Sequence, residues 1–147
     1  MTRDIDVTLG VDVDEFARVL TALQPARFEV LSENAEEFAR KTRVLPLRDS
    51  ESGIRIDLIF SFSPYERQAI GRGTSIRIGQ VDVRYASLED LIVHKMVAGR
   101  PRDVEDVRGI LARNPAYDRS YVLKWLREFR GGIGKDIATE FENLADL

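Results

Sequence analysis

Two short segments decide the fold of this chain: Thr2-Arg3-Asp4-Ile5-Asp6-Val7 near its start and Ile54-Arg55-Ile56-Asp57-Leu58-Ile59 further along. Each sets aspartate among β-branched and apolar residues, a pattern typical of a β-strand. Residues two apart on a strand point to the same face, so Asp4 and Asp6 are expected together, with Cα atoms about 6.5–7 Å apart. Asp57 is expected to join them from a neighbouring strand. These three carboxylates form the first candidate site.

An all-carboxylate set favours magnesium or manganese over zinc, because hard cations prefer oxygen ligands. Two such ions about 3.5–4 Å apart hold the attacking and leaving oxygens in nucleotidyl transfer. The alternative is that the three acids are solvated residues at strand ends. A carboxylate within a buried strand is costly unless a cation or hydrogen bonds compensate it. Both interpretations stay open from spacing alone.

The amino-acid composition limits the kinds of catalytic site, metal site and partner that the chain can have. The 147 residues include no cysteine and one histidine, His94, which excludes disulfides, thiolate catalysis and Cys- or His-rich zinc sites. The net charge of −3 argues against nucleic-acid binding by overall charge, although a local basic patch stays open. No signal-like apolar segment and no run long enough to span a bilayer is found, so we expect a soluble cytoplasmic protein.

Hydrophobic periodicity predicts an α+β fold, with an α/β core over residues 1–85 that carries a mixed sheet and flanking helices, and a helical part over residues 86–147. Strands are expected at 5–9, 28–31, 44–47, 54–60, 75–78 and 81–85. Helices are expected at 13–24, 35–41, 64–69, from 87 to the glycine at 99, at 102–113, after 118 and at 137–144.

Particular residues fix the ends of these elements. Asp12, Ser87 and Asp118 are expected N-caps, and Gly79-Gln80 is expected to close a hairpin. The glycines at 131, 132 and 134 are expected to form a loop. The stripe of Tyr121, Trp125 and Phe129 has helical spacing and is interpreted as core.

A second constellation lies on the late helices. Lys95 interrupts an apolar face, and Asp103 and Asp106 are three apart and so share a helix face. A lysine here suits the neutralisation of triphosphate oxygens, with Asp103 positioning its ammonium or orienting the nucleophile. The simpler interpretation is a snorkelling lysine beside an exposed Arg102–Asp106 pair. His94 is interpreted as a surface or packing residue.

Gly71-Arg72-Gly73 suggests phosphate binding at first sight. It has neither a strand-to-helix frame nor a lysine-serine ending, so it is not a P-loop. We interpret it as a loop into the hairpin, with Arg67 and Arg72 as candidate substrate contacts.

Taken together, these segments resemble the nucleotidyltransferase-fold family of the polymerase-beta superfamily, in particular its small bacterial AbiEii-like branch. The resemblance covers most of the chain. It is carried by Thr2–Val7, by Ile56–Ile59, by Ala86–Ile92 leading to Lys95, and by Ala98–Asp106. The order of all four segments is more specific than any one of them.

The resemblance implies a nucleotidyltransferase-like core with a helical tail, and assigns roles to the candidate residues. It implies the metal ligands Asp4, Asp6 and Asp57, the catalytic residues Asp57, Lys95 and Asp103, and triphosphate contacts from Lys95, Arg102 and Asp106. In this assignment Asp57 also helps to deprotonate the acceptor hydroxyl.

The reaction implied is transfer of a nucleoside monophosphate from a nucleoside triphosphate, with Mg²⁺ or Mn²⁺, to an RNA such as transfer RNA or to a protein hydroxyl. Positioning and charge neutralisation carry most of such catalysis. Members of the family often serve as toxin-like modules, so an antitoxin is an expected partner.

One departure from the family pattern supports a rival hypothesis. The family places a Gly-Gly or Gly-Ser turn before the Asp-x-Asp strand, whereas only Met1, Thr2 and Arg3 precede Asp4 here. A late start, a truncation or loss of the turn are the three explanations. The rival is a non-catalytic domain on the same fold, a binding or regulatory protein that forms a homodimer.

Overall fold

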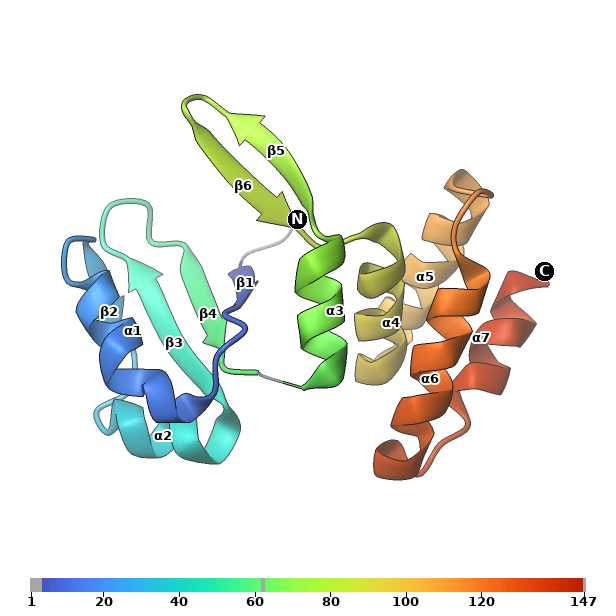
Figure 1. Ribbon diagram of the computed structural model, residues 1–147, viewed down its shortest axis with the longest axis horizontal. Coiled ribbons are helices and arrows are strands. Elements are labelled where there is room, and N and C mark those ends of the chain that lie inside the picture. Colours follow the sequence, from blue (N-terminus) through green and yellow to red (C-terminus); the bar gives the residue numbers. More distant parts are fainter. Residues whose placement is uncertain (1–3, 62, 147) are drawn as a thin grey trace. The chain divides into compact units, whose positions relative to one another are not determined.

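The computed structural model describes residues 4–61 and 63–146 (Figure 1). Met1, Thr2 and Arg3, which open the first quoted segment, lie outside these residues. The chain forms two compact units, Met1–Gly71 and Arg72–Leu147. The boundary expected between residues 85 and 86 separates a nucleotidyltransferase-like core from a helical part. That assignment stays a prediction.

The first unit holds a four-stranded sheet and its helices. Its elements are β1 (Asp4–Thr8), the short 3-10 helix η1 (Val13–Glu15), α1 (Phe16–Leu23), β2 (Phe28–Val30), α2 (Ala35–Thr42), β3 (Val44–Asp49), β4 (Arg55–Ile59) and α3 (Pro64–Arg72), whose last residue begins the second unit. Ser63 and Glu66 cap α3 reciprocally: the Ser63 amide donates to Glu66 Oε2 and the Glu66 amide to Ser63 Oγ.

The sheet is mixed, with the strand order β1-β4-β3-β2. β1 runs parallel to β4, whereas β4 with β3 and β3 with β2 are antiparallel. In the parallel pair, Asp4 lies beside Arg55 and Asp6 beside Asp57. The two segments that the sequence marks as strands are therefore direct neighbours.

The two faces of this sheet differ in character. One face packs under η1, α1 and α2 and forms the core of the unit. The buried residues of that core are Val13, Phe16, Ala39, Leu45, Leu47, Leu58 and Phe60. Because side chains alternate along a strand, Asp57 points to the opposite face from its neighbour Leu58, and Asp4 and Asp6 share that opposite face.

The second unit joins a hairpin to a helical region. Its elements are β5 (Thr74–Ile78), β6 (Val81–Tyr85), α4 (Leu88–Ala98), α5 (Pro101–Arg113), α6 (Arg119–Ile133) and α7 (Ile137–Ala145). Ile78 pairs with Val81 across Gly79-Gln80, as the sequence predicts, and Gly79 adopts the positive φ of 60° that such a turn requires.

The helical region is built around α4, which packs against α5, α6 and α7. Its buried side chains come from all four helices, among them Ile92, Val107, Leu126 and Phe141. The predicted α+β architecture is confirmed at this level: a mixed four-stranded sheet with helices, followed by a region of four helices.

Two of the three predicted N-caps are confirmed. Ser87 Oγ accepts from the Asp90 amide at 3.1 Å, and Asp118 Oδ1 from the Tyr121 amide at 2.9 Å. Asp12 stands before η1 but makes no capping bond. Its Oδ1 instead accepts from Arg43 Nη1 at 2.7 Å, since a guanidinium is a stronger donor than a backbone amide.

The glycine loop expected at residues 131, 132 and 134 is wrong. The first two glycines continue α6, and only Gly134, with a φ of 70°, ends that helix. Tertiary packing of α6 on α4 and α7 extends the helix through residues of low intrinsic propensity. Across residues 4–61 and 63–146, no helix has the length and hydropathy needed to cross a bilayer.

Burial differs along the core-side face of the sheet, and this difference predicts unequal costs of truncation. Leu45 on β3 is 0% exposed and Ile5 on β1 is 49% exposed. We expect Leu45→Ala to lower the free energy of unfolding by about 2–5 kcal/mol through lost burial and a cavity. Ile5→Ala, the matched control, should cost under about 1 kcal/mol. Urea unfolding followed by circular dichroism measures both, and equal costs would contradict the assigned core.

Candidate functional site

The three predicted metal ligands share one face of the sheet. Asp6 and Asp57 are register partners on the parallel strands β1 and β4, and Asp4 lies two residues before Asp6. Asp4 and Asp6 are exposed, whereas the Asp57 side chain is 18% exposed. The three aspartates thus lie on one face of the sheet, and their role as metal ligands stays a prediction.

A guanidinium already compensates part of this negative charge. Arg55 lies two residues before Asp57 on β4, and its Nε donates to Asp57 Oδ1 at 3.0 Å and to Oδ2 at 3.2 Å. The hydrogen bond and charge of Asp57, with smaller contributions from Asp4 and Asp6, raise the pKa of Arg55. Arg55 is therefore the internal counter-ion of the acidic face.

This arrangement bears directly on the expected metal site. Within the described ranges, no three Asp, Glu or His side chains converge as ligands of one ion. The all-oxygen donor set suits a hard cation such as Mg²⁺. For a cation to reach Asp57, Arg55 must turn away from that carboxylate, and an exposed arginine side chain turns at little cost.

The second predicted constellation also forms. Lys95 on α4 lies between two carboxylates of α5, with its Nζ 2.6 Å from Asp106 Oδ2 and 3.6 Å from Asp103 Oδ1. Asp103 is buried, and Arg100 Nε lies 2.5 Å from its Oδ2. Asp103 therefore holds Lys95 from one side, as the sequence analysis expected of a positioning residue.

The positive charges of Lys95 and Arg100 favour the ionised form of both carboxylates. The hydrogen bond from Arg100, followed by the charges of Arg100 and Lys95, lowers the pKa of Asp103. The hydrogen bond from Lys95 lowers the pKa of Asp106. Arg102 acts on Asp106 through charge alone, because Asp106 is paired with Lys95. The simple Arg102–Asp106 pair of the alternative interpretation is thus wrong, and Lys95 takes its place.

These two groups belong to different units, the carboxylates of the sheet to the first and the Lys95 cluster to the second. His94 is exposed on α4, as expected for a surface histidine.

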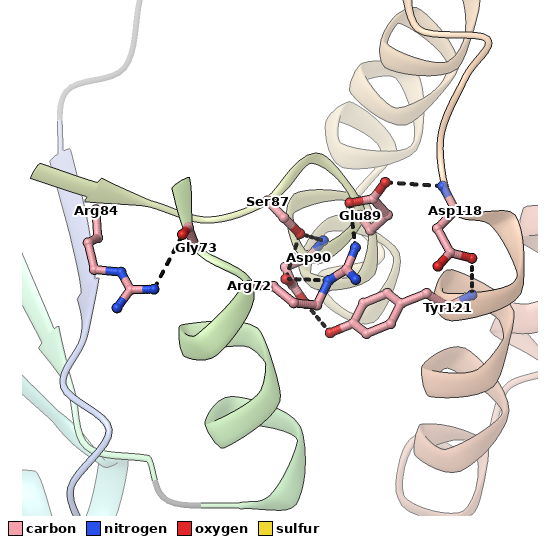
Figure 2. Close-up of polar contacts among 8 residues, drawn as sticks. All are labelled: Arg72, Gly73, Arg84, Ser87, Glu89, Asp90, Asp118 and Tyr121. Atoms are coloured by element: carbon pink, nitrogen blue, oxygen red, sulfur yellow. Dashed lines mark hydrogen bonds and ion pairs between the residues drawn. The ribbon is translucent and has the colours of Figure 1, made fainter. Parts of the chain in front are cut away.

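Sequence analysis missed a buried polar network in the second unit (Figure 2). Its centre is Asp90 of α4, which is 1% exposed. Asp90 Oδ2 accepts from Ser87 Oγ at 2.6 Å, and Asp90 Oδ1 accepts from the Tyr121 hydroxyl at 2.7 Å. The spacing of Ser87 and Asp90 revealed the helix cap, but no sequence signal indicated that Asp90 is buried.

Arg72 completes the network, and its predicted role as a substrate contact receives no support. Its Nη2 donates to Glu89 Oε2 at 3.0 Å, and its guanidinium carbon lies 4.0 Å from the centre of the Tyr121 ring. Glu89 Oε1 in turn accepts from the Asp118 amide at 3.1 Å. Arg72, the first residue of the second unit, is thereby held against α4 and α6 (Figure 2). The loop expected at Gly71-Arg72-Gly73 is wrong for its first two residues, which end α3.

No protein-family model matches the chain, and a search of curated proteins finds no match either. The resemblance to the nucleotidyltransferase fold therefore rests on the quoted segments alone and stays a prediction.

Removal of Lys95 should be visible in the carboxylates that hold it. We expect Lys95→Gln to raise the pKa of Asp106 and, to a smaller extent, that of Asp103, because each loses a neighbouring positive charge. Titration of the side-chain carboxyl carbons by NMR measures both. Arg108→Gln on the same helix, which breaks only an exposed pair with Glu105, is the control and should leave both pKa values unchanged. Unchanged values in Lys95→Gln would contradict the described cluster.

The Tyr121–Asp90 bond should contribute to stability. We expect Tyr121→Phe to cost about 1–3 kcal/mol, because a buried carboxylate loses a donor. Tyr117→Phe, a half-buried tyrosine of the same region, is the control and should cost less.

The same substitution changes the alkaline stability profile. Burial, then Asp90, raises the pKa of Tyr121, so its contribution is full below the unfolded pKa of about 10 and is lost as the pH rises above that value. The free energy of unfolding, measured between neutral pH and pH 11, should therefore decline more steeply for the parent than for Tyr121→Phe. Parallel declines would contradict this assignment.

Proposed function

We propose that this chain is a magnesium-dependent nucleotidyltransferase that moves a nucleoside monophosphate from a nucleoside triphosphate to a hydroxyl group. The observation that carries the proposal is the register of β1 and β4, which sets Asp6 beside Asp57 with Asp4 on the same face. Acidic side chains that share one sheet face repel each other, and a bound cation that serves chemistry would offset that repulsion.

The roles of the residues follow from their chemistry. Asp4, Asp6 and Asp57 would hold Mg²⁺, which supplies positive charge to the phosphates and the attacking oxygen. Asp57, the most shielded of the three, accepts the proton of the acceptor hydroxyl. The resemblance assigns contacts with the triphosphate to Lys95, which Asp103 and Asp106 hold, and to Arg102.

The proposed acceptor is an RNA, such as transfer RNA, or a protein side chain, and the proposed biological setting is a toxin-like module with an antitoxin partner. These finer assignments rest on the resemblance to the polymerase-beta superfamily and its AbiEii-like branch. The mixed sheet followed by four helices is compatible with that fold.

A second candidate function is a non-catalytic binding or regulatory domain on the same fold. The observation that favours it is the Arg55–Asp57 pair, because a site with its own counter-ion has no need of a metal. In that case Arg55 would be a permanent structural partner of Asp57 rather than a residue displaced by Mg²⁺.

Thermal unfolding with each nucleoside triphosphate, in the presence and absence of Mg²⁺, separates the two functions. A ligand at about 100 times its Kd stabilises the folded state by about 2.7 kcal/mol. We expect one nucleotide to stabilise the parent only when Mg²⁺ is present, and Asp6→Asn to abolish that effect. Asp14→Asn is the matched control, since its side chain is 82% exposed and lies outside the sheet.

Arg55→Gln sharpens the comparison. If Arg55 competes with Mg²⁺ for Asp57, its removal should increase the stabilisation by Mg²⁺ alone. The nucleotidyltransferase proposal fails if no nucleotide with Mg²⁺ stabilises the parent, or if Asp6→Asn responds as the parent does. The non-catalytic function is then the better account.

A further inference from the structure

A row of charged side chains crosses the sheet of the first unit, next to the three aspartates. Asp4 lies opposite Arg55, and Arg48 lies opposite Glu29. The two arginines lie directly opposite each other on β4 and β3. Residues opposite each other on neighbouring strands share a face, and Arg55 shares its face with Asp57, two positions along β4. Both arginines therefore lie on the face that carries the candidate metal ligands.

The direct opposition of two arginines is unfavourable by itself. Like charges directly across a strand pair are destabilising. The side chains of Arg48 and Arg55 are 51% and 54% exposed, so both guanidinium groups are accessible from solvent. An anion bound between them offsets their repulsion and accepts charge-assisted hydrogen bonds from both.

The carboxylate partners of the two arginines do not prevent this role. Arg48 Nη1 lies 3.7 Å from Glu29 Oε2, which is too long for a hydrogen bond. Arg55 Nε donates to both oxygens of Asp57, but Asp57 is also a proposed ligand of Mg²⁺. A cation bound to Asp57 replaces Arg55 as the counter-charge of that carboxylate. Binding of the cation therefore releases the Arg55 guanidinium beside Arg48.

We propose that Arg48 and Arg55 bind the triphosphate of the nucleotide, and that Arg55 exchanges Asp57 for a phosphate oxygen when Mg²⁺ binds. The inference rests on the proposed function and adds to it the residues that hold the triphosphate on the sheet. A guanidinium group suits this role because its planar N–H groups match phosphate oxygens in pairs. Placed there, both groups stabilise the negative charge of the phosphates.

The order of charges across the sheet fits a polyphosphate bound to a cation. The carboxylates lie on β1 and β4, and the two guanidinium groups lie on β4 and β3. Neighbouring strands are about 4.8 Å apart, so the guanidinium groups are within reach of a phosphate chain held by the carboxylate-bound cation. A cation subsite and an anion subsite thus adjoin on one face.

Opposite effects on two ligands test the exchange. Isothermal titration calorimetry of the full chain measures the Kd of Mg²⁺ alone and the Kd of inorganic triphosphate in the presence of Mg²⁺. We expect Arg55→Gln to bind Mg²⁺ more tightly, because a competitor for Asp57 is removed. The same variant should bind triphosphate about tenfold or more weakly, because a charged donor is lost.

Two further variants complete this comparison. Arg48→Gln should weaken the binding of triphosphate and leave the binding of Mg²⁺ alone unchanged, since Arg48 is not paired with a candidate metal ligand. Arg40→Gln is the matched control. Its side chain is 50% exposed and is paired with Asp14 and Glu36, outside the sheet, so neither Kd should change.

A metal-free measurement separates this inference from the proposed activity. Asp57→Asn removes the carboxylate that holds Arg55, so Arg55 is released without a cation. After divalent cations are removed on a chelating resin, this variant should bind inorganic triphosphate more tightly than the parent does. Adding Arg55→Gln to the same variant should abolish the gain. Circular dichroism checks that each variant folds, and Asp57→Ser replaces Asp57→Asn if the latter does not.

The inference is overturned if Arg48→Gln and Arg55→Gln bind triphosphate as the parent does. It is also overturned if Arg55→Gln weakens Mg²⁺ and triphosphate alike, because a purely structural partner of Asp57 gives losses of one sign. A dependence on both arginines seen with an RNA oligonucleotide, and not with triphosphate, would assign them to the acceptor and overturn it as well.

Failure of the proposed function gives a different result. If no nucleotide with Mg²⁺ binds the parent, the nucleotidyltransferase proposal fails. The metal-free comparison then decides the role of the arginines by itself. A gain in Asp57→Asn that depends on Arg55 supports a phosphate-binding site, and the absence of that gain overturns it.

Discussion

The parallel pairing of β1 with β4 is the constraint on which the first unit depends. A single register sets Ile5 beside Ile56 and Val7 beside Leu58 on the core side, and at the same time Asp6 beside Asp57 on the other side. A slip of one residue would exchange these faces and bury the acids. The hydrophobic core and the candidate site are thus two consequences of one pairing.

Charge compensation by internal cations is the common feature of the polar clusters. Arg55 lies against Asp57, Lys95 lies between Asp103 and Asp106, and Arg72 lies over Tyr121 beside Asp90 and Glu89. The clusters differ in how firmly the cation is held. Arg55 is exposed and able to turn toward solvent, whereas Arg72 is bound by an ion pair and by an aromatic ring. This difference is why Arg55 is expected to give way to a cation, whereas Arg72 is assigned a structural role.

Much of the fold was predictable because it follows from local rules. Alternation identified the strands of the hairpin, and Ser87 and Asp118 marked helix starts that the structure confirms. The failures also have physical causes. The sequence predicted a loop at Gly131 and Gly132, whereas the packing of α6 keeps both residues in the helix. The sequence predicted that Asp12 caps a helix. Its carboxylate instead accepts a hydrogen bond from Arg43, a stronger donor 31 residues away in sequence.

The sequence by itself determined which residues can carry chemistry: three strand aspartates, a lysine on an apolar helix face and two aspartates one helical turn apart. These assignments need only the periods of the strand and the helix. Tertiary structure alone decided which partners those groups have. Asp6 comes to lie beside Asp57, Lys95 lies between two carboxylates, and Asp90 is buried against Tyr121 from another helix. Burial and charge pairing depend on long-range packing, and no local pattern encodes the distance between residues that meet only in the folded chain.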